Sequence, residues 1–253
     1  MNKQPKLTLV GAGPGDPELI TLKGVRALRE ADVVLYDALA NEELLEYAEN
    51  AEKIFVGKRK GMHKFIQEKI QELVVKHALK GKHVVRLKGG DPFIFGRGSE
   101  ELKFVIQHGI EIDIVSGVTS AIAAPASFGI SLTQRGVNES FRVITGTRSD
   151  LKLSEDIEAA ANSNTTIVIL MGMSKLENIV NMFKAKGKNT IPVAIIENGT
   201  KTQERLAVGT IDTILNIVNE KGLTNPSIIV VGETVKESEV LYSQLLTQKG
   251  KSL

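Results

Sequence analysis

The sequence predicts two α/β domains, the first with a five-stranded, mainly parallel sheet and the second with a mixed sheet. Three observations support this fold class. Short apolar runs alternate with helix-forming segments, the runs of the first half are apolar on both sides, and two runs of the second half are joined without a helix. With 253 residues, the chain is long enough for two cores. We expect domains at 1–117 and 118–245, followed by a loosely ordered tail at 246–253.

In the first domain, five β-rich runs predict strands. They lie at 7–10, 32–36, 53–56, 83–87 and 112–115. The segment 64–80 between two of them carries apolar residues at steps of three and four, which predicts a helix. Since strands so apolar need cover on both faces, we expect a parallel sheet between two layers of helices.

In the second domain, five further runs predict strands. They lie at 141–145, 165–171, 191–196, 203–209 and 227–232, with helices expected at 175–186 and 211–221. The short turn "ENGTKT" joins the third of these strands to the fourth. A turn of this length allows only antiparallel pairing, so the sheet is expected to be mixed.

Composition excludes several classes of function. The 32 basic and 30 acidic side chains give a net charge of +2, which predicts no general attraction to nucleic acid or anionic membranes. The chain has no cysteine, and its four histidines lack the spacing of a helical metal site, so we expect no metal. No apolar signal core precedes the first strand, and no apolar run approaches the roughly 20 residues of a membrane span. We therefore expect a soluble, cytoplasmic protein.

Each predicted strand of the first domain ends in a loop rich in glycine, charge or hydroxyl groups. These loops read "GAGPGD", "DALA", "GKRKG", "KGGDPFIFGRG" and "SGVTSA". In parallel sheets, ligands bind at the carboxyl ends of the strands. The sequence therefore predicts a binding site along this edge.

The first loop permits two interpretations. Gly11 and Gly13 follow a strand, and Asp37 lies 24 positions beyond Gly13, as in a dinucleotide site of an NAD(P)-dependent oxidoreductase. Against this, Asp16 stands where the third glycine of that motif is required, and its carboxylate would repel a pyrophosphate. The fourth loop is more informative, because Gly89 and Gly90 allow close approach of a ligand to the main chain.

The order and content of the motifs resemble one known family. The motifs are "VGAGPGDPELITLKG", "ADVVLYD", "VGKRKGMH", "VVRLKGGDPFIFGRG", "GVTSAIAAPA", "GISLTQR", "MGM" and "ENGT". In this order they resemble the tetrapyrrole methylase family, over about residues 7 to 232. Within the family, "YDAL" resembles the branch that methylates uroporphyrinogen III.

The resemblance implies that S-adenosylmethionine binds in a folded conformation, in a cleft between the two domains. The cofactor-binding residues that match the family's motifs are Pro14, Gly89, Gly90, Asp91, Ile94, Thr119, Ser120, Met171 and Gly199. The resemblance implies that Asp37 is the general base and Lys58 the proton donor. Alternatively, Asp37 could be an ordinary turn carboxylate, and Lys58 could simply hold a substrate carboxylate. Candidates for the remaining substrate carboxylates are Lys60, Arg97 and Arg135.

The implied reaction is methylation of uroporphyrinogen III at two ring carbons, C2 and C7, to give precorrin-2 for siroheme or cobalamin. A homodimer is also implied, without the further modules of fused siroheme enzymes. The alternatives are a later corrin-pathway methylase, a diphthine synthase, a non-catalytic binding protein or the oxidoreductase above. The sequence departs from the family's usual pattern at Ser99, Ser116, Gln134 and Thr147.

Overall fold

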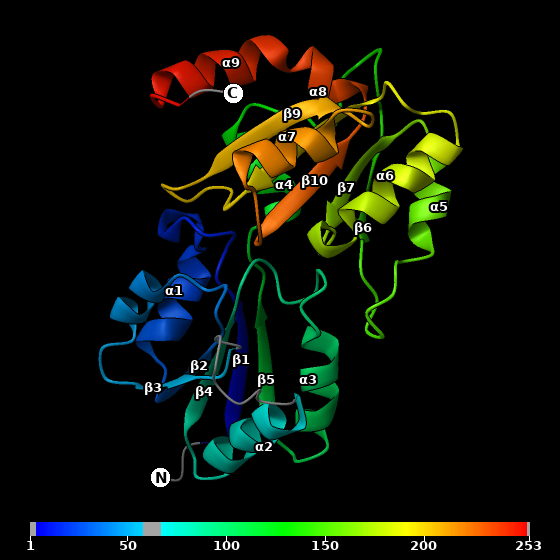
Figure 1. Ribbon diagram of the computed structural model, residues 1–253. Coiled ribbons are helices and arrows are strands. Elements are labelled where there is room, and N and C mark those ends of the chain that lie inside the picture. Colours follow the sequence, from blue (N-terminus) through cyan, green and yellow to red (C-terminus); the bar gives the residue numbers. More distant parts are fainter. Residues whose placement is uncertain (1–3, 58–66, 252–253) are drawn as a thin grey trace. The chain divides into compact units, whose positions relative to one another are not determined.

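The computed structural model describes residues 4–57 and 67–251 of the chain. Contacts divide it into two compact units, Met1–Thr119 and Ser120–Leu253. Figure 1 labels the helices and strands of both units. Each unit is an α/β structure with one five-stranded sheet, which confirms the predicted fold class.

The sheet of the first unit is entirely parallel, as predicted, with the strand order β3-β2-β4-β1-β5. Its strands are β1 (Lys6–Gly11), β2 (Val33–Tyr36), β3 (Glu52–Phe55), β4 (His83–Lys88) and β5 (Glu111–Val115). In the register of these strands, Gly11 pairs with Lys88, Tyr36 with Leu87, and Val10 with Val115. The loops that follow β1, β2, β4 and β5 therefore leave the sheet side by side.

Helices cover both faces of this sheet. The elements are η1 (Pro17–Leu19), α1 (Leu22–Arg29), η2 (Glu42–Tyr47), α2 (Gln67–Ala78) and α3 (Gly98–Ile106). One core cluster joins α1 and η2 to strand residues such as Val34 and Leu87, and the other joins α2 and α3 to residues such as Leu35 and Val84. Because side chains alternate along a strand, Arg86 and Lys88 lie on the same face as Val84, under α2 and α3.

The sheet of the second unit is mixed, again as predicted, with the order β6-β7-β10-β8-β9. Its strands are β6 (Phe141–Thr145), β7 (Thr166–Leu170), β8 (Pro192–Glu197), β9 (Arg205–Thr210) and β10 (Ser227–Val231). β6 and β7 are parallel, whereas β10 runs antiparallel to both β7 and β8. β8 and β9 form the predicted antiparallel hairpin. The carboxyl ends of β6, β7 and β8 consequently share one edge of this sheet.

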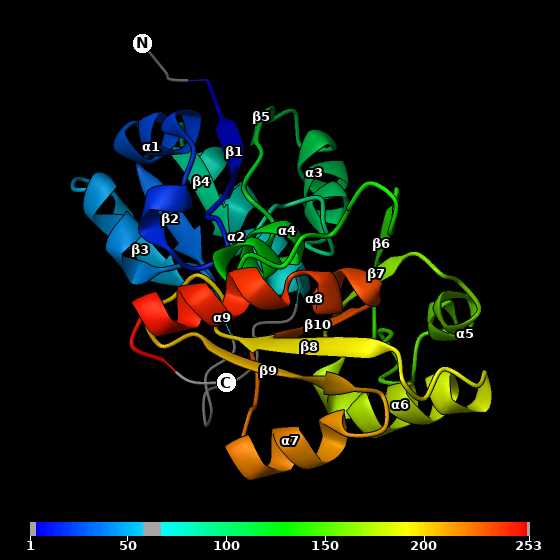
Figure 2. The same cartoon turned by 90° about the horizontal axis from the view of Figure 1, so that it is seen from above.

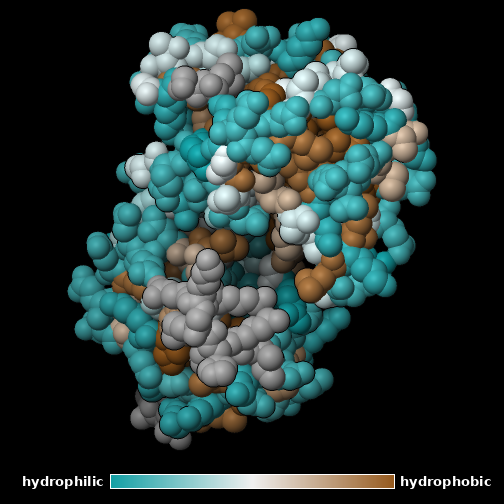
Figure 3. Space-filling model, in the orientation of Figure 1, coloured by the Kyte–Doolittle hydropathy of each residue, from teal (hydrophilic) through white to brown (hydrophobic). Residues whose placement is uncertain are grey.

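Helices also cover both faces of the second sheet, as Figure 2 shows. The elements are α4 (Ser120–Ser127), α5 (Asp156–Ala161), η3 (Met173–Lys175), α6 (Leu176–Ala185), α7 (Ile214–Lys221), α8 (Glu233–Glu237) and α9 (Glu239–Gln248). α4, α8 and α9 pack on one face, and α5, α6 and α7 on the other. Hydrophobic residues remain visible between α6 and α7 in the space-filling view of Figure 3, on a face that is otherwise mostly hydrophilic.

The end of the chain differs from the expected loose tail. Leu246 is buried in a core cluster of the second unit, and α9 continues to Gln248. Lys249 Nζ then donates to Glu204 Oε1 at 2.6 Å and to Ser127 O at 2.7 Å. Lys251 Nζ also lies 3.7 Å from Glu204 Oε1, so a buried carboxylate binds the lysines of this segment. Within the described ranges, no helix has the length and apolar character needed to cross a membrane.

Candidate functional site

The loops that follow β1 and β4 are bound directly to each other through their main chains. Gly90 N donates to Gly13 O at 2.7 Å, and Gly13 N donates to Gly90 O at 3.3 Å. Just before this pair, Ala12 N donates to Lys88 O at 2.8 Å. The two glycine motifs of the sequence therefore form one connected surface at the carboxyl edge of the sheet.

Glycine is required here because three loop backbones touch. A Cβ added to Gly117 would lie 2.3 Å from Gly90 O and 2.7 Å from Gly11 Cα. A Cβ added to Gly11 would lie 2.5 Å from Gly117 Cα. These distances are far below van der Waals contact, so Gly11 and Gly117 serve the packing of the loops on one another.

Gly90 differs from these two glycines. A Cβ added to it would meet only Thr119 Cα, at 4.0 Å, although its φ of +67° itself favours glycine. The side of Gly90 on which a Cβ would lie is therefore open, although its N–H and carbonyl groups are bound to Gly13. Gly89 is a packing position, since an added Cβ would lie 2.5 Å from Leu39 Cβ in the loop after β2.

The interpretation of the first loop as a dinucleotide site does not fit the local structure. Asp16 Oδ1 accepts a hydrogen bond from Glu18 N at 2.9 Å and caps η1, a 3-10 helix of only three residues. A pyrophosphate site needs a helix N-terminus with free main-chain donors. At this position a carboxylate takes one of those donors, and the helix is too short to provide a substantial dipole.

Asp91 is fixed by two main-chain donors from different parts of the edge. Phe93 N donates to its Oδ1 at 2.8 Å, and Gly117 N donates to its Oδ2 at 3.0 Å. The apolar side chains that follow, Phe93, Ile94 and Phe95, each remain nearly half exposed, with Ile94 at 43%. Exposed apolar side chains beside a fixed carboxylate suit a ligand with both polar and flat apolar parts.

Asp37 follows β2 at the same edge and makes two kinds of contact. Its Oδ1 accepts hydrogen bonds from the main-chain N–H groups of Leu39 at 3.1 Å and Ala40 at 3.3 Å. Its Oδ2 lies 3.4 Å from Arg86 Nη2. Asp37 therefore stabilises a turn, which is the alternative role considered for it in the sequence. Its Oδ2 is not used by the turn.

Beneath this edge lies a buried group of charges that the sequence analysis missed. Lys88 Nζ donates to Glu101 Oε1 at 2.6 Å, and Arg86 Nε lies 3.6 Å from Glu101 Oε2. Burial lowers the pKa of the Lys88 ammonium, and the nearby Arg86 lowers it further, while Glu101 opposes both effects. The available signal was two charges at a spacing of two, in "VVRLK", on a strand that is otherwise apolar.

Three of the predicted cofactor-binding residues belong to the second unit, and two of them follow strands that end at the edge shared by β6, β7 and β8. Met171 follows β7, has a φ of +54° and is 50% exposed, and its carbonyl accepts from Thr147 Oγ1 at 2.7 Å. Gly199 follows β8, where a Cβ would lie 2.3 Å from Ala124 Cβ of α4. Ser120 is the first residue of α4. The residues on either side of Gly199, Asn198 and Thr200, also have positive φ angles.

Of the remaining predicted residues, Pro14 and Arg97 lie within these loops, and Thr119 lies beside Gly90. Pro14 lies between Gly13 and Gly15 of the first loop, whereas Thr119 is the last residue of the first unit. Arg97 is exposed and forms a forked pair with Glu100, with Nη2 to Oε2 at 2.6 Å. Arg135 is exposed in the turn closed by Gln134 and Asn138.

Lys58 and Lys60 lie outside the described residues. The expected placement of the active site in a cleft between the domains stays a prediction. Among residues 4–57 and 67–251, no group of three or more histidine, aspartate or glutamate side chains is arranged to hold a metal ion.

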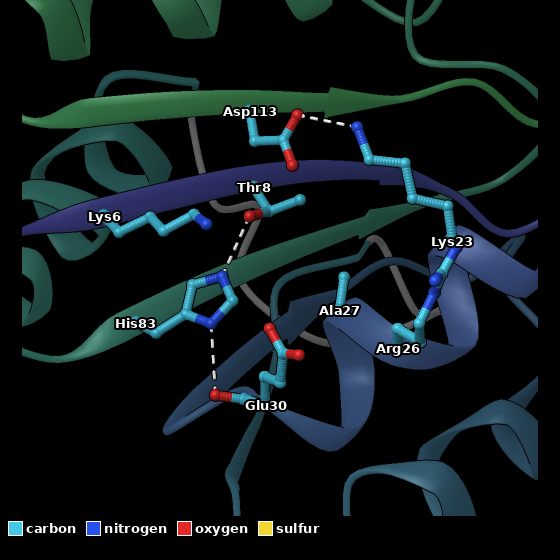
Figure 4. Close-up of a pocket in the computed structure, with 8 residues that line it drawn as sticks. All are labelled: Lys6, Thr8, Lys23, Arg26, Ala27, Glu30, His83 and Asp113. Atoms are coloured by element: carbon cyan, nitrogen blue, oxygen red, sulfur yellow. Dashed lines mark hydrogen bonds and ion pairs between the residues drawn. The ribbon is translucent and has the colours of Figure 1, made fainter.

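A cavity of about 340 Å³ opens at the other end of the first sheet, as Figure 4 shows. Lys6 and His83, which line it, are the first residues of β1 and β4. His83 Nε2 lies 2.8 Å from Thr8 Oγ1, and Lys23 Nζ donates to Asp113 Oδ1 at 2.8 Å. Because these polar groups pair with one another and lie away from the strand carboxyl ends, we do not assign the site here.

Comparison with known proteins gives consistent results. A sequence model of the Tetrapyrrole (Corrin/Porphyrin) Methylases matches residues 6–215. The chain is 49% identical, over 242 residues, to a uroporphyrinogen-III C-methyltransferase of Methanocaldococcus jannaschii, covering 94% of this chain and 99% of that protein.

Solved structures agree with these sequence matches. The crystal structure of uroporphyrin-III C-methyl transferase from Thermus thermophilus, complexed with S-adenyl homocysteine, is similar with a TM-score of 0.79 and 36% identity. It covers 92% of this chain and 99% of that chain. A cobalt precorrin-4 methyltransferase of cobalamin biosynthesis has a TM-score of 0.81 at 28% identity, covering 91% and 95% of the two chains.

Proposed function

Because the chain belongs to the tetrapyrrole methylase family, we propose that it methylates uroporphyrinogen III with S-adenosylmethionine as methyl donor. Two ring carbons, C2 and C7, receive a methyl group each, and the product is precorrin-2, an intermediate for siroheme or cobalamin. The names of relatives that align over nearly the whole chain support this substrate. The structural neighbour complexed with S-adenyl homocysteine supports the donor.

The observation that carries the proposal is the open side of Gly90, where a side chain would otherwise stand, beside the fixed carboxylate of Asp91. Glycine backbone that borders open space can approach the donor closely, and a carboxylate can accept from ribose hydroxyl groups. Ile94 and Met171, both about half exposed, offer apolar surface. The proposed donor site consists of Pro14, Gly89, Gly90, Asp91, Ile94, Thr119, Ser120, Met171 and Gly199.

The donor, when bound, supplies an electrophilic methyl group on a sulfonium. The protein then has two tasks, to orient an electron-rich ring carbon and to accept the proton that this carbon loses. Orientation alone can lower a barrier by ~7–11 kcal/mol. Asp37 is the proposed base, since its Oδ2 is not used by the turn that holds its Oδ1.

A tetrapyrrole with eight carboxylates requires several cations. Lys58 is the proposed proton donor at the reacting ring, or it holds one of these carboxylates. Lys60, Arg97 and Arg135 bind others. Arg97 is already paired with the exposed Glu100, so the substrate must compete for it. Exposed ion pairs contribute only about 0–1 kcal/mol, which makes such exchange inexpensive.

The proposal extends to assembly and location. Resemblance to the family supports a homodimer, which sedimentation velocity would test through the mass of the particle. The absence of cysteine from the sequence is compatible with a reducing cytoplasm.

The decisive test is an anaerobic reaction of the purified chain with uroporphyrinogen III and S-adenosylmethionine, followed by mass spectrometry. Two added methyl groups per macrocycle are expected. Methylation of a later corrin intermediate instead would favour the relationship to the cobalt precorrin-4 enzyme, and methylation of neither substrate would contradict the proposal.

Asp37→Asn provides the matched variant for the proposed base. Asparagine keeps an oxygen that accepts from Leu39 N and Ala40 N but cannot take a proton at neutral pH. We expect kcat to fall by roughly 10²–10⁴-fold, the usual contribution of a general base, while S-adenosylhomocysteine binding is retained. An unchanged kcat would leave Asp37 as a turn carboxylate only.

A further inference from the structure

Arg86 is a buried arginine on an interior strand of the first sheet. Its side chain is 4% exposed, and Nη1 donates to the main-chain carbonyl groups of Leu35 at 3.2 Å and Leu87 at 2.9 Å. Nη2 reaches Asp37 Oδ2 at 3.4 Å. The guanidinium thus spans from β4 to the end of β2, and one of its edges faces the proposed base.

Arg86 belongs to a charge quartet, which we define as Asp37, Arg86, Lys88 and Glu101. The last three are buried, and Asp37 is 24% exposed. Two positive and two negative charges balance one another, and Gln67 Nε2 adds a hydrogen bond to Glu101 Oε1 at 2.9 Å. Arg86 Nε and Glu101 Oε2, both buried, lack a hydrogen-bond partner among the described residues. Arg86 Nε is therefore held by charge attraction to Glu101, whereas the hydrogen bonds of Nη1 and Nη2 go to Leu87 O on its own strand, to Leu35 O on β2 and to Asp37 Oδ2.

A gain in folding stability does not explain why these charged residues are buried here. Buried ion pairs pay a large desolvation cost, and apolar replacements of similar volume are often as stable or more stable. Neighbouring positions on β4, such as Val84 and Val85, show that apolar residues fill this sheet well. Arg86 instead connects this group to Asp37 at the carboxyl edge, and charged groups buried beside a ligand-binding edge are typical of functional sites.

We propose that Arg86 is a positioning residue for Asp37. Its guanidinium fixes Asp37 Oδ2 at the carboxyl edge of the first sheet and offsets the negative charge of the carboxylate. Lys88 and Glu101 complete the balance of charge that allows Arg86 to be buried. The inference rests on the proposed function, because it assigns Arg86 a role that acts only through the proposed base.

The contact geometry predicts how Arg86 acts. Oδ1 is occupied by two main-chain donors, so Oδ2 is the oxygen available to a proton. A distance of 3.4 Å to Nη2 orients this oxygen without a short hydrogen bond that would compete with protonation. Loss of Arg86 should therefore lower kcat, whereas KM for uroporphyrinogen III and the Kd of S-adenosylhomocysteine should change little.

The test is a double-mutant cycle with Arg86→Met and Asp37→Asn. If Arg86 acts through Asp37, Arg86→Met lowers kcat by an expected ~30-fold in the unmodified chain and by less than about 3-fold in the Asp37→Asn chain. A merely structural role would lower kcat by the same factor in both chains, and that result would overturn the inference. Arg142→Met, at an exposed arginine on β6, is the matched control and should leave kcat unchanged.

Removal of Arg86 alone leaves an excess negative charge in the quartet, so the single variant can fail to fold. Arg86→Met combined with Glu101→Gln restores a net charge of zero and replaces Arg86→Met in the cycle in that case. Equal losses of kcat in the two backgrounds would again overturn the inference. If the unmodified chain transfers no methyl group to uroporphyrinogen III, the proposed function fails and this inference fails with it, whereas additive losses in an active chain overturn only the role of Arg86.

Discussion

Asp91 and Gly117 are joined across two loops by a hydrogen bond, in which Gly117 N donates to Asp91 Oδ2 at 3.0 Å. The other carboxylate oxygen accepts from Phe93 N at 2.8 Å. One side chain therefore orders its own loop after β4 and ties it to the segment after β5. This arrangement gives Asp91 a structural role in addition to its proposed contact with the methyl donor.

We expect Asp91→Ala to weaken both functions of this residue. Two main-chain donors would lose their acceptors, which costs about 1–3 kcal/mol of unfolding free energy for each group left unsatisfied. Asp91→Asn keeps an oxygen for Phe93 N but presents an amide to Gly117 N, so its loss should be smaller. Urea denaturation measures the stability, and calorimetric titration with S-adenosylhomocysteine measures the affinity. Equal stability of the alanine and asparagine variants would contradict this account.

Gly117→Ala should disrupt the contact of the three loop backbones. The new Cβ would lie 2.3 Å from Gly90 O, and main-chain atoms cannot move away as a flexible side chain can. We expect a loss of about 3 kcal/mol or more in unfolding free energy, together with a loss of S-adenosylhomocysteine binding.

Gly109→Ala is the control for this substitution. Gly109 has a φ of +66° and no atom within 4 Å of an added Cβ, so alanine there meets only backbone strain, about 1–2 kcal/mol. The thermal unfolding midpoints of the two variants compare the steric clash at position 117 with the backbone strain at position 109. If Gly117→Ala were no less stable than Gly109→Ala, the loops would not pack as described.

The strands could be predicted because burial leaves a local pattern. The run at residues 83–87 is apolar enough to require cover on both faces, and β4 occupies His83–Lys88. The short turn between β8 and β9 likewise fixed their antiparallel pairing. In both cases the information lies within a few neighbouring residues.

The candidate site was predictable only in part, because its contacts join residues far apart in the chain. The order of the loops indicated the carboxyl edge, but no spacing rule reveals that Gly11 touches Gly117 or that Arg86 faces Asp37. The burial of Lys88 likewise depends on its ion pair with Glu101 of α3, and no local sequence pattern indicates that these two residues meet. Such pairings arise from the strand order of the sheet.

Thr147 supports the loop that follows β7 and so provides a further prediction. Its hydroxyl group donates to Met171 O at 2.7 Å and so supports a non-glycine residue with a φ of +54°. We expect Thr147→Val to weaken S-adenosylhomocysteine binding by roughly 2–13-fold, corresponding to the ~0.5–1.5 kcal/mol of one hydrogen bond. Thr147→Ser keeps the hydroxyl group and should bind normally. Equal affinities of the valine and serine variants would show that this bond does not matter for the loop.

Glu204 connects the end of the chain to the loop that contains Gly199. Its carboxylate is buried and accepts from Lys249 Nζ at 2.6 Å, from Ser127 Oγ at 2.8 Å and from Thr200 N at 2.9 Å. Burial alone would raise the pKa of Glu204, but these hydrogen bonds outweigh burial and lower the pKa below the ordinary value of 4.5.

A carboxyl group with a lowered pKa in the folded state makes stability depend on pH. The unfolded chain binds the proton at higher pH, so the contribution of Glu204 is fully present above about pH 4.5 and is lost as the pH falls through its folded-state pKa. Glu204→Gln should lose about 1–3 kcal/mol of unfolding free energy at pH 7 and show a shallower decline below pH 4.5. Urea denaturation at pH 7 and at several acidic values measures both effects. Glu139→Gln, at an exposed glutamate, should retain the slope of the unmodified chain, and the same slope in Glu204→Gln would show that Glu204 does not cause the decline.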